Sequence, residues 1–437
     1  TISRNDGTSS FGEAVTLDES PLDPAVLWVG FDDGNLQVSR DGGGTWTEVS
    51  RNVRGIADGT YVSRIAASAF ARGTAYATFD AHRDGDFRPW VFRTRDFGAS
   101  WEPLHAGLPE MGVVNVIVEH PDDAATLFVG TEHHVFASTN GGADWAKVPN
   151  LPTTHTGDMV IHPREKDLVL GTHGQGLWIL DDTRPIAEWA RASAPVTVFS
   201  SATGTLFHYR KDTSYRGQEA YAGTNPVDGV EITYRIRSGS GDATLRVTDG
   251  RGRLVRQMTV PGGAGTHRVN WDLRHGLGDG PERWARWDDP ALARNIEERG
   301  PFVSPGTFTV TVEAGGQRGV NTVRVVGDPE MPITQAMYES RERFLLEALE
   351  LQRQITATMR DHGIQGGGFG FGGGPSTAPS TPGEKLRAAS RLIRQVYGGL
   401  SGSAVRQGSL YPPTVAQRER ALEARRLYDE ALASMEN

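Results

Sequence analysis

The sequence predicts a mainly β protein in which β-propeller blades are followed by an immunoglobulin-like β-sandwich and a C-terminal α-helical segment. Three observations predict this order. One short hairpin pattern occurs three times in the first third of the chain. Alternating apolar and polar runs of strand length follow between residues 197 and 328. From residue 333 the apolar residues recur at three- and four-residue spacing, which is typical of a helix.

The repeated pattern has the form S/T-x-D-x-G-x-T-W and is known as the Asp-box. Its copies are SRDGGGTW at 39–46, TRDFGASW at 94–101 and STNGGADW at 138–145. The glycines permit positive φ in a tight turn, and the acidic residue accepts hydrogen bonds from backbone amides of the turn. We therefore assign structural roles to the polar and tryptophan positions of the three boxes, with the tryptophans expected in the core. These residues are Asp41, Trp46, Asp96, Trp101, Asn140 and Trp145. In the third box Asn140 and Asp144 replace the usual Asp and Thr, so we expect a weaker hairpin there.

Each box follows an apolar strand, and a fourth such strand comes without a box. These strands lie at 27–30, 75–78, 127–130 and 168–171, each preceded by another alternating run. A unit of four short strands every 40 to 50 residues or so is the period of a propeller blade. We predict four blades within residues 1–182, near 13–50, 62–104, 113–148 and 158–182, the last without its outer strand.

Four blades could close a small ring, although rings of six or more are commoner for this repeat. The chain opens on Thr1 inside a predicted loop. Our hypothesis is that it is the C-terminal part of a longer precursor, with further blades upstream or in a second chain.

The remaining domains follow in order along the chain. Residues 183–196 form a connector, and residues 197–328 form the sandwich, interrupted by an irregular insert at 278–302. Residues 329–437 form the helical tail, with a Gly-rich linker at 365–382. The tail is expected to hold helices at 333–362, 383–398 and 414–436 that pack as a small stabilising bundle.

Composition excludes several classes of site and partner. The chain of 437 residues has no cysteine, which removes thiol catalysis, thiolate zinc sites and disulfides. A net charge of −9 without a basic block argues against a nucleic-acid partner. No apolar run approaches the roughly 20 residues that a membrane span requires, so we expect no transmembrane segment.

Taken together, these motifs resemble a bacterial family of exported propeller proteins related to sortilin (Vps10-like) and to Asp-box (BNR) glycosyl hydrolases. Residues 119–145 and 151–182 are similar to the closing blades of that family, and 247–256 and 264–274 to the sandwich that follows them. The resemblance implies a secreted, periplasmic or cell-surface location and a carbohydrate or protein ligand. The chain has no counterpart of the cysteine-rich module that follows the sortilin propeller, and no three-arginine sialidase constellation can be assigned.

Loops at one end of the blades are the expected ligand face, because the rigid blades hold them in place. Glycoside hydrolysis needs two carboxyl groups about 5 to 10 Å apart across a groove. The candidates from different blades are Asp33, Asp80 and Glu132. Acidic loop residues also cap turns, and both interpretations stay open.

The same loops offer two metal interpretations and one stacking residue. Imidazoles of His133, His134, His155 and His173 could bind a transition metal or contact a ligand directly. Asp80, Asp84 and Asp86 could bind Ca²⁺ through oxygen ligands, although the EF-hand spacing is absent. Trp90 could stack on a sugar ring, with burial as the alternative.

The absence of a strong catalytic constellation favours a non-catalytic function. We therefore predict an exported binding or scaffold module for a carbohydrate or protein partner. The alternative is a glycoside hydrolase that uses paired carboxylates on the propeller face, with part of its site on blades missing from this chain.

Overall fold

The computed structural model describes residues 12–207, 229–277, 282–283, 300–365, 378–401 and 408–435. The chain divides into two compact units, Thr1–Ser193 and Ala194–Asn437. Each unit is described by itself.

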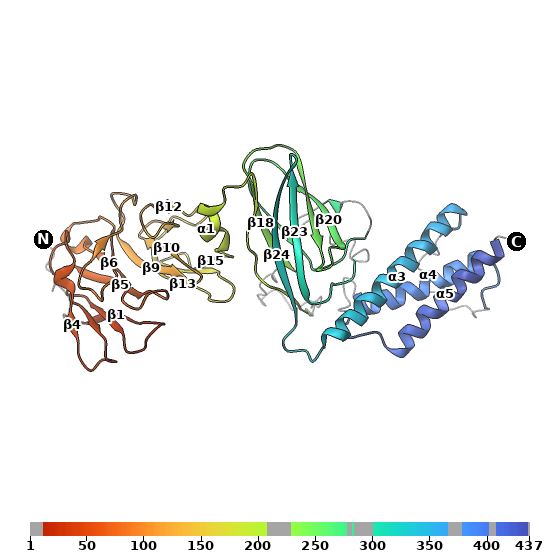
Figure 1. Ribbon diagram of the computed structural model, residues 1–437, viewed down its shortest axis with the longest axis horizontal. Coiled ribbons are helices and arrows are strands. Elements are labelled where there is room, and N and C mark those ends of the chain that lie inside the picture. Colours follow the sequence, from red (N-terminus) through yellow and green to blue (C-terminus); the bar gives the residue numbers. More distant parts are fainter. Residues whose placement is uncertain are drawn as a thin grey trace. The chain divides into compact units, whose positions relative to one another are not determined.

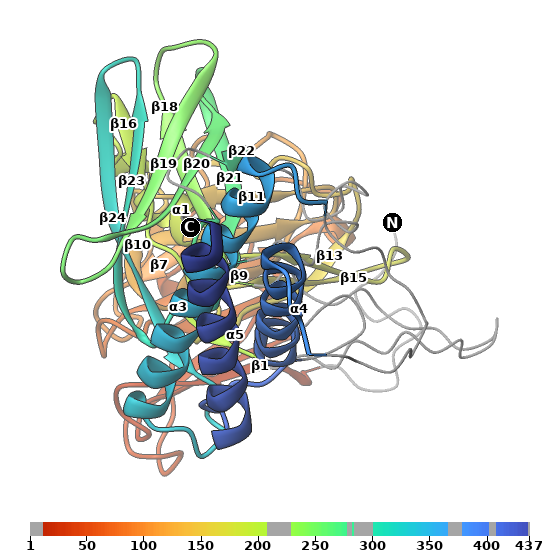
Figure 2. The same cartoon turned by 90° about the vertical axis from the view of Figure 1, so that its right-hand side faces the viewer.

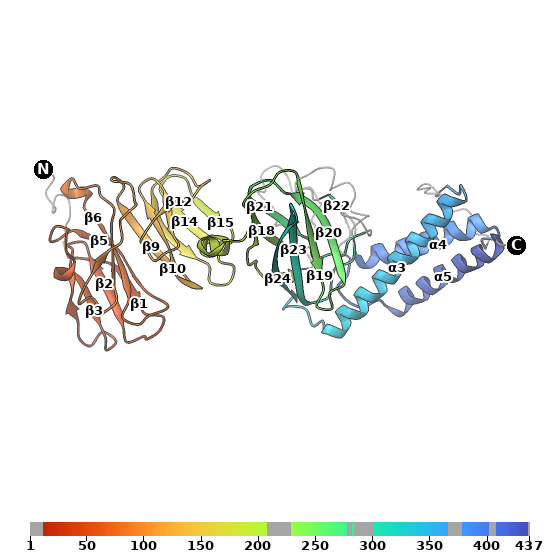
Figure 3. The same ribbon diagram turned by 45° about the horizontal axis from the view of Figure 1, so that its top comes forward.

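The first unit consists of four antiparallel sheets in chain order (Figures 1 and 3). Three of them have four strands and the order of a propeller blade, and the fourth has three strands among the described residues. The strands are β1 (Ala14–Glu19), β2 (Leu27–Phe31), β3 (Leu36–Ser39), β4 (Thr47–Glu48), β5 (Tyr61–Ala67), β6 (Ala75–Asp80), β7 (Trp90–Thr94), β8 (Glu102–Pro103), β9 (Val114–His120), β10 (Asp123–Thr131), β11 (Val135–Ser138), β12 (Ala146–Lys147), β13 (Thr156–Ile161), β14 (Leu168–Thr172) and β15 (Leu177–Leu180). We call the sheets blades 1 to 4.

Consecutive blades pack through a repeated apolar arrangement. The large second-strand residues Trp28, Tyr76 and Phe128 are fully or almost fully buried. Trp28 belongs to a buried cluster with Ala75 and Ala77 of blade 2. Tyr76 packs in the same way with blade 3, and Phe128 with blade 4. Because side chains alternate across a strand, each blade has one face for the preceding blade and one for the next.

Hydrogen bonds join the first strands of neighbouring blades. The amide of Ile65 donates to Oγ1 of Thr16 over 3.1 Å, and Oγ of Ser63 donates to the carbonyl of Val114 over 2.8 Å. Nδ2 of Asn115 donates to the carbonyl of Thr156 over 3.2 Å, which continues the series to blade 4. Blades stacked side by side about their first strands are the arrangement of a β-propeller. The first unit is therefore an arc of propeller blades.

The three repeated hairpins, at 39–46, 94–101 and 138–145, follow the expected hydrogen-bond scheme. Asp41 accepts from the Thr45 amide over 2.8 Å and from its hydroxyl over 2.7 Å. In the third hairpin Asn140 accepts from the Asp144 amide over 3.0 Å, while its own Nδ2 donates to the Asp144 carboxylate over 3.0 Å. The two replacements compensate each other, because donor and acceptor are exchanged as a pair. The third hairpin therefore keeps two hydrogen bonds between these positions, and its expected lower strength stays a prediction.

The box tryptophans differ in burial, and this corrects the expectation that all three lie in the core. Trp145 is buried, and its indole donates to the carbonyl of Leu104 in the preceding blade. Trp101 packs edge-on against Trp28, also in the preceding blade. Trp46 is 39% exposed. Blade 1 is the first of the arc, so no described blade precedes Trp46 to cover it.

The predicted connector contains a short helix, α1 (Arg184–Glu188), and a 3₁₀ turn, η3 (Trp189–Arg191). Pro185 lies in the first turn of the helix, where its missing amide costs nothing. Ile186 packs against the apolar cluster between blades 3 and 4.

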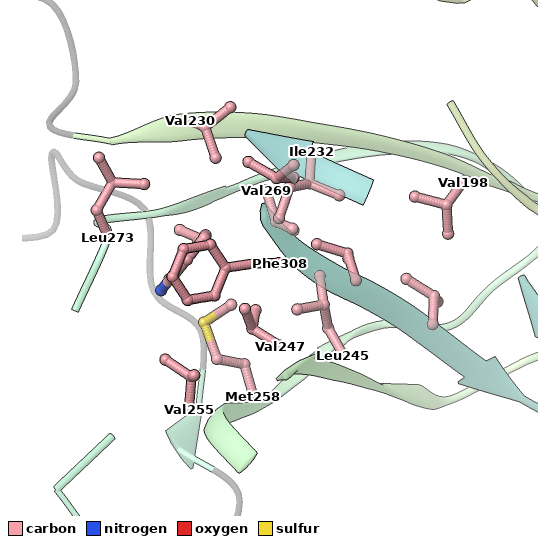
Figure 4. Close-up of a cluster of buried hydrophobic side chains, with 14 of the residues drawn as sticks. Val198, Val230, Ile232, Leu245, Val247, Val255, Met258, Val269, Leu273 and Phe308 are labelled. Carbon is pink, nitrogen blue, oxygen red and sulfur yellow. The ribbon is translucent and has the colours of Figure 1, made fainter. Parts of the chain in front are cut away.

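The second unit begins with two sheets around one core, the layering of a β-sandwich. The three-stranded sheet has the order β16-β18-β21 and the six-stranded sheet the order β17-β24-β23-β19-β20-β22. Figure 4 shows the core, in which Phe308 lies among Val247, Met258 and Val269. The strands are β16 (Val196–Val198), β17 (Gly204–Leu206), β18 (Val230–Ile236), β19 (Asp242–Thr248), β20 (Leu254–Pro261), β21 (Gly265–Trp271), β22 (Glu282–Arg283), β23 (Gly306–Ala314) and β24 (Gln317–Gly327). Most of the predicted insert at 278–302 lies outside the described residues.

Three helices complete the second unit: α3 (Gln335–Asp361), α4 (Pro382–Ser401) and α5 (Val415–Met435). They pack side by side (Figure 2) around an apolar core that includes Ile355, Ile393 and Ala424. The first turns of α3 also contact the sandwich, because Tyr338 belongs to the sandwich core. Most of the predicted Gly-rich linker lies outside the described residues. Among the described residues, no helix combines the length and the apolar character needed to span a membrane.

Candidate binding face of the blade arc

The loops between the second and third strands of each blade lie at one end of the arc, together with the connections between blades. Backbone hydrogen bonds join them into one surface. The Glu132 amide donates to the Val113 carbonyl over 3.2 Å, and the Gly112 amide donates to the Phe87 carbonyl over 2.9 Å. We call this surface the loop face.

The three carboxylates predicted for hydrolysis lie on this face, one on each of blades 1 to 3. Asp33 accepts from the amide of Asn35 over 3.0 Å, which is a local turn contact. Asp80 accepts from the amide of His82 over 2.9 Å, and the same oxygen lies 2.6 Å from Nδ1 of the His82 ring. Glu132 is half-buried beside the exposed His133. Two of the three carboxylates therefore stabilise their own loops.

The acidic loop proposed for Ca²⁺ has protein partners in this structure. Asp86 accepts from Nε and Nη2 of Arg88 over 2.9 and 2.8 Å and from the indole of Trp90 over 3.1 Å. The Arg88 hydrogen bonds are the main reason that the pKa of Asp86 falls to about 2. Asp84 lies two residues earlier, in the 3₁₀ turn η2 (His82–Asp84).

The four predicted histidines lie along adjoining loops of blades 3 and 4. The Thr154 amide donates to the His133 carbonyl over 3.0 Å, and the His173 amide donates to the His155 carbonyl over 2.9 Å. The rings of His155 and His173 meet edge to face with centroids 6.0 Å apart. The side chains of His133, His155 and His173 are exposed.

His134 differs from the other three histidines. It is half-buried, and burial is the main cause that lowers its pKa. Nζ of Lys147 lies 3.3 Å from its Nε2 atom. His134 therefore belongs to the wall of blade 3 more than to the open surface.

Neither metal interpretation finds its set of ligands in the part of the chain that the structure describes. Within those ranges no group of three or more His, Asp or Glu side chains is arranged to hold a metal ion. All four histidines and the three aspartates of the acidic loop lie within the described residues.

Trp90, which we considered as a sugar-stacking residue, is buried inside the arc. Its ring stacks on Phe92 with centroids 6.1 Å apart and meets the ring of His105 edge-on at 5.1 Å. Arg88 covers it from the loop side, 4.5 Å above the ring centroid. The alternating pattern of the strand places Trp90 inward, so the stacking interpretation is corrected.

The structure adds residues that the sequence reasoning did not select. Nη2 of Arg64 in blade 2 lies 2.5 Å from Oδ1 of Asp158 in blade 4, so this pair spans the first strands of non-adjacent blades. Tyr61 begins the same strand as Arg64, and Arg83 lies 5.6 Å from its ring centroid. A charged residue inside an inner strand is the signal that could have identified Arg64 and Asp158.

Among the residues that the structure describes, the carboxyl groups with raised pKa lie between blades and not on the loop face. Burial raises the pKa of Asp18, which accepts from the Ala67 amide across blades 1 and 2. Burial also raises the pKa of Glu119, which accepts from the Ser68 and Tyr76 hydroxyls across blades 2 and 3. Both groups are half-buried and accept hydrogen bonds across neighbouring blades, so they serve the blade contacts.

A cavity of about 740 Å³ lies in the second unit, between α4 and α5. Its lining includes the ion pair of Lys385 with Glu430 and that of Arg426 with Glu423. These groups pair with each other, and the lining also includes Arg387 and Arg391, so the groove is polar.

Comparisons with known proteins give weak structural similarities. No protein-family model and no curated protein matches the chain. YCF48 from Cyanidioschyzon merolae is 14% identical with a TM-score of 0.26, over 74% of this chain and 86% of that one. A nidogen/laminin complex chain is 14% identical with a TM-score of 0.30, over 39% of this chain and 61% of that one. An ancestral GH74 enzyme is 13% identical with a TM-score of 0.30, over 72% of this chain and 41% of that one.

This chain therefore spans less than two thirds of the nidogen/laminin and GH74 chains. The propeller assignment rests on the sheet order and the blade contacts described above.

Proposed function

We propose that the chain is an exported binding or scaffold protein whose loop face recognises a carbohydrate or protein ligand. A rigid arc that presents loops from successive blades suits this role, because the blades fix the loops without constraining their sequences. The exported location and the relation to Asp-box proteins of the sortilin type are part of this proposal, as is the immunoglobulin-like character of the sandwich. Further blades, upstream or in a second chain, would extend the same face.

The observation that supports binding most directly is the state of the polar side chains on the loop face. His133, His155 and His173 are exposed, while their backbones are held across blades 3 and 4 by hydrogen bonds. A preorganised polar surface of this kind loses little conformational freedom when a ligand binds. The histidines offer donors and acceptors for hydroxyl, amide or carboxylate groups of a ligand.

The electrostatics support binding over hydrolysis. A glycosidase needs a carboxylic acid of raised pKa facing its groove. Here the two carboxyl groups with a raised pKa, Asp18 and Glu119, are half-buried and hydrogen-bonded across neighbouring blades, and Asp86 on the loop face has a lowered pKa. Glycoside hydrolysis that uses Asp33, Asp80 or Glu132 with groups on further blades remains the second candidate.

A glycan and peptide binding screen of the full chain tests the proposal. We expect at least one ligand class to bind the wild type, and the triple variant His133→Ala, His155→Ala and His173→Ala to lose roughly tenfold or more in affinity. The matched control is His362→Ala, an exposed histidine at the end of α3, which should bind as the wild type does.

Hydrolysis of chromogenic glycosides is measured on the same preparations. Turnover that disappears in Asp80→Asn or Glu132→Gln would overturn the binding proposal in favour of the enzyme. Equal binding by the wild type and the triple histidine variant would remove the loop-face histidines from the site.

A further inference from the structure

The cavity of about 740 Å³ between α4 and α5 has more cationic than acidic side chains in its lining. We call it the α4–α5 groove. Its cationic residues are Lys385, Arg387, Arg391 and Arg426. Its acidic residues are fewer, namely Glu384, Glu423 and Glu430, so the charges of the lining do not cancel. A volume of this size can hold a small organic molecule.

Two of the carboxylates belong to ion pairs that link α4 with α5 or lie within α5. The carboxylate of Glu423 lies 2.6 Å from Nη2 of Arg426, and that of Glu430 lies 3.0 Å from Nζ of Lys385. Glu430 also pairs with Arg426. These contacts occupy both acids together with Lys385 and Arg426.

The third carboxylate, Glu384, caps the start of α4. Its Oε2 atom accepts from the amides of Ser380 and Thr381 over 2.9 and 3.1 Å. These two backbone hydrogen bonds are the main reason that the pKa of Glu384 falls to about 2. Glu384 is therefore engaged by the backbone and is not paired with an arginine of the groove within the described residues.

Arg387 and Arg391 are the two cations of the lining that have no acidic partner among the residues that the structure describes. They lie one turn apart on α4, and Gln395 continues the same row one turn further along. Arg387 is half-buried and Arg391 is exposed. Like charges at this spacing destabilise a helix slightly, so a bound anion would relieve their repulsion.

The segments that flank α4 in the sequence offer no counter-ion for these arginines. Residues 365–382 contain no Asp or Glu, and neither do residues 402–414. The positive charge of the row on α4 is therefore not neutralised from its neighbours in sequence. An anion from solution would supply the missing charge.

Apolar side chains lie between the charged residues of the groove. Leu427 of α5 is 5% exposed, Ala388 and Leu392 of α4 are half-buried, and all three line the groove. A ligand would therefore meet apolar surface beside the two guanidinium groups. A guanidinium group matches a carboxylate or a phosphate through two parallel hydrogen bonds. The lining thus suits an anion that carries an apolar body.

We propose that the α4–α5 groove binds a small organic anion whose carboxylate or phosphate group pairs with Arg387 and Arg391. The apolar body of the ligand contacts Leu392 and Leu427. The groove belongs to the second unit and the loop face to the first. This site is therefore separate from the proposed ligand face, and its test does not depend on the outcome there.

Fluorine NMR with three small probes tests the proposal on the full chain. The probes are para-fluorophenyl phosphate, para-fluorobenzoate and the neutral para-fluorobenzyl alcohol. The wild type should bind at least one of the two anions with a Kd of roughly 1 mM or tighter. The neutral probe should bind at least roughly tenfold more weakly, because it cannot pair with a guanidinium group. The anion that binds more tightly identifies the oxyanion that the site prefers.

Substitutions on α4 test the two arginines individually. Arg387→Gln and Arg391→Gln each remove one guanidinium group, and glutamine is as good a helix former as arginine. Each should weaken binding of the anion by roughly tenfold and leave binding of the neutral probe unchanged. Arg394→Gln is the matched control, because Arg394 is exposed on the same helix and does not line the groove. It should bind as the wild type does.

Thermal unfolding gives a second measurement that a purely structural role of the arginines would not change. The melting temperature of the wild type should rise with the concentration of the anionic probe, because the ligand stabilises the state that binds it. The double variant Arg387→Gln with Arg391→Gln should show no such rise. Circular dichroism and the melting temperature without ligand establish that the variants are folded.

Three outcomes would overturn the proposal. A wild type that binds neither anion at roughly 10 mM has no such site. A neutral probe that binds as tightly as the anions shows that apolar surface alone accounts for binding. Equal affinity of the wild type and the folded double variant for the anion places its binding elsewhere on the chain.

Discussion

The contact between blades 2 and 3, which we call a seam, and the face of blade 1 that points away from blade 2 use the same repeat positions, yet three of these positions differ in burial. Ile117, Glu119 and Trp145 of blade 3 are all engaged by blade 2. Their counterparts in blade 1, Leu17, Glu19 and Trp46, are exposed. The blades are alike in sequence pattern, so their different surroundings follow from their place in the arc.

This comparison shows that burial in a repeat protein depends on the neighbouring unit. Each blade buries its faces only against other blades, so stability is approximately the sum of blade and seam contributions. The predictions below compare matched positions inside a seam and at the end of the arc, in order of decreasing effect.

The largest difference in the loss of unfolding free energy is expected between substitutions at the matched apolar residues Ile117 and Leu17. Ile117→Ala should cost about 2 to 5 kcal/mol, because it opens a cavity in a fully packed seam. Leu17→Ala should cost no more than about 0.5 kcal/mol while the chain is monomeric, because its side chain is exposed. The free energy of unfolding of the first unit, measured with urea at low chain concentration, provides the comparison. Equal losses would show that the Leu17 face is covered in solution even at low concentration.

A smaller difference is expected for the acidic pair Glu119 and Glu19. Glu119→Ala removes the acceptor for the Ser68 and Tyr76 hydroxyls and the Ala69 amide. Buried donors left without an acceptor should cost about 1 to 3 kcal/mol. Glu19→Ala should be nearly neutral, because Glu19 is exposed. Hydrogen exchange at the Ala69 amide, which should accelerate only in Glu119→Ala, shows whether the seam itself has loosened.

The smallest expected effect is a difference in acid sensitivity between the first and third hairpins. The side chain that accepts the hydrogen bonds of the turn is Asp41 in the first hairpin and Asn140 in the third. Hydrogen bonds from the Thr45 side chain and backbone are the main reason that the pKa of Asp41 falls from 3.8 to about 2. A lowered pKa in the folded state means that this stabilisation is complete above pH 3.8 or so and is lost as the pH falls through about 2.

In the third box the acceptor of the Asp144 amide is the neutral Asn140, which does not titrate. Amide chemical shifts followed from pH 7 into acid should therefore move more for Thr45 than for the amide of position 144 in the variant Asp144→Asn, which removes the carboxylate of that residue itself. The double variant Asn140→Asp with Asp144→Thr should transfer the acid sensitivity to the third hairpin. An equal response of the Thr45 amide and the position-144 amide of Asp144→Asn would contradict the assigned acceptors.

The blade pattern was predictable because its determinants are local. Alternation of apolar residues, the turn glycines and the hydrogen-bonding residues of the box act within about 10 residues of one another. The predicted blades near 13–50 and 113–148 contain the strands β1 to β4 and β9 to β12. The helices α3 to α5 were predictable for the same reason, since their apolar period is written in consecutive residues.

The state of the candidate side chains was not predictable, because it depends on residues from other loops and blades. The strand alternation at Trp90 did not reveal that Arg88 and His105 enclose its ring. The pairing of Arg64 with Asp158 joins residues 94 positions apart in the chain. Sequence spacing gives no measure of such contacts.

By itself, the sequence determined the repeat, the order of sheets and helices, and the type of residue on each face of a blade, because these follow from local geometry. Only the tertiary structure decided which of those faces are covered. Ile117 and Leu17 are both apolar residues in the first strand of a blade, and the sequence treats them alike. Burial is a property of the neighbours in space, so their different exposure is visible only once the blades are stacked.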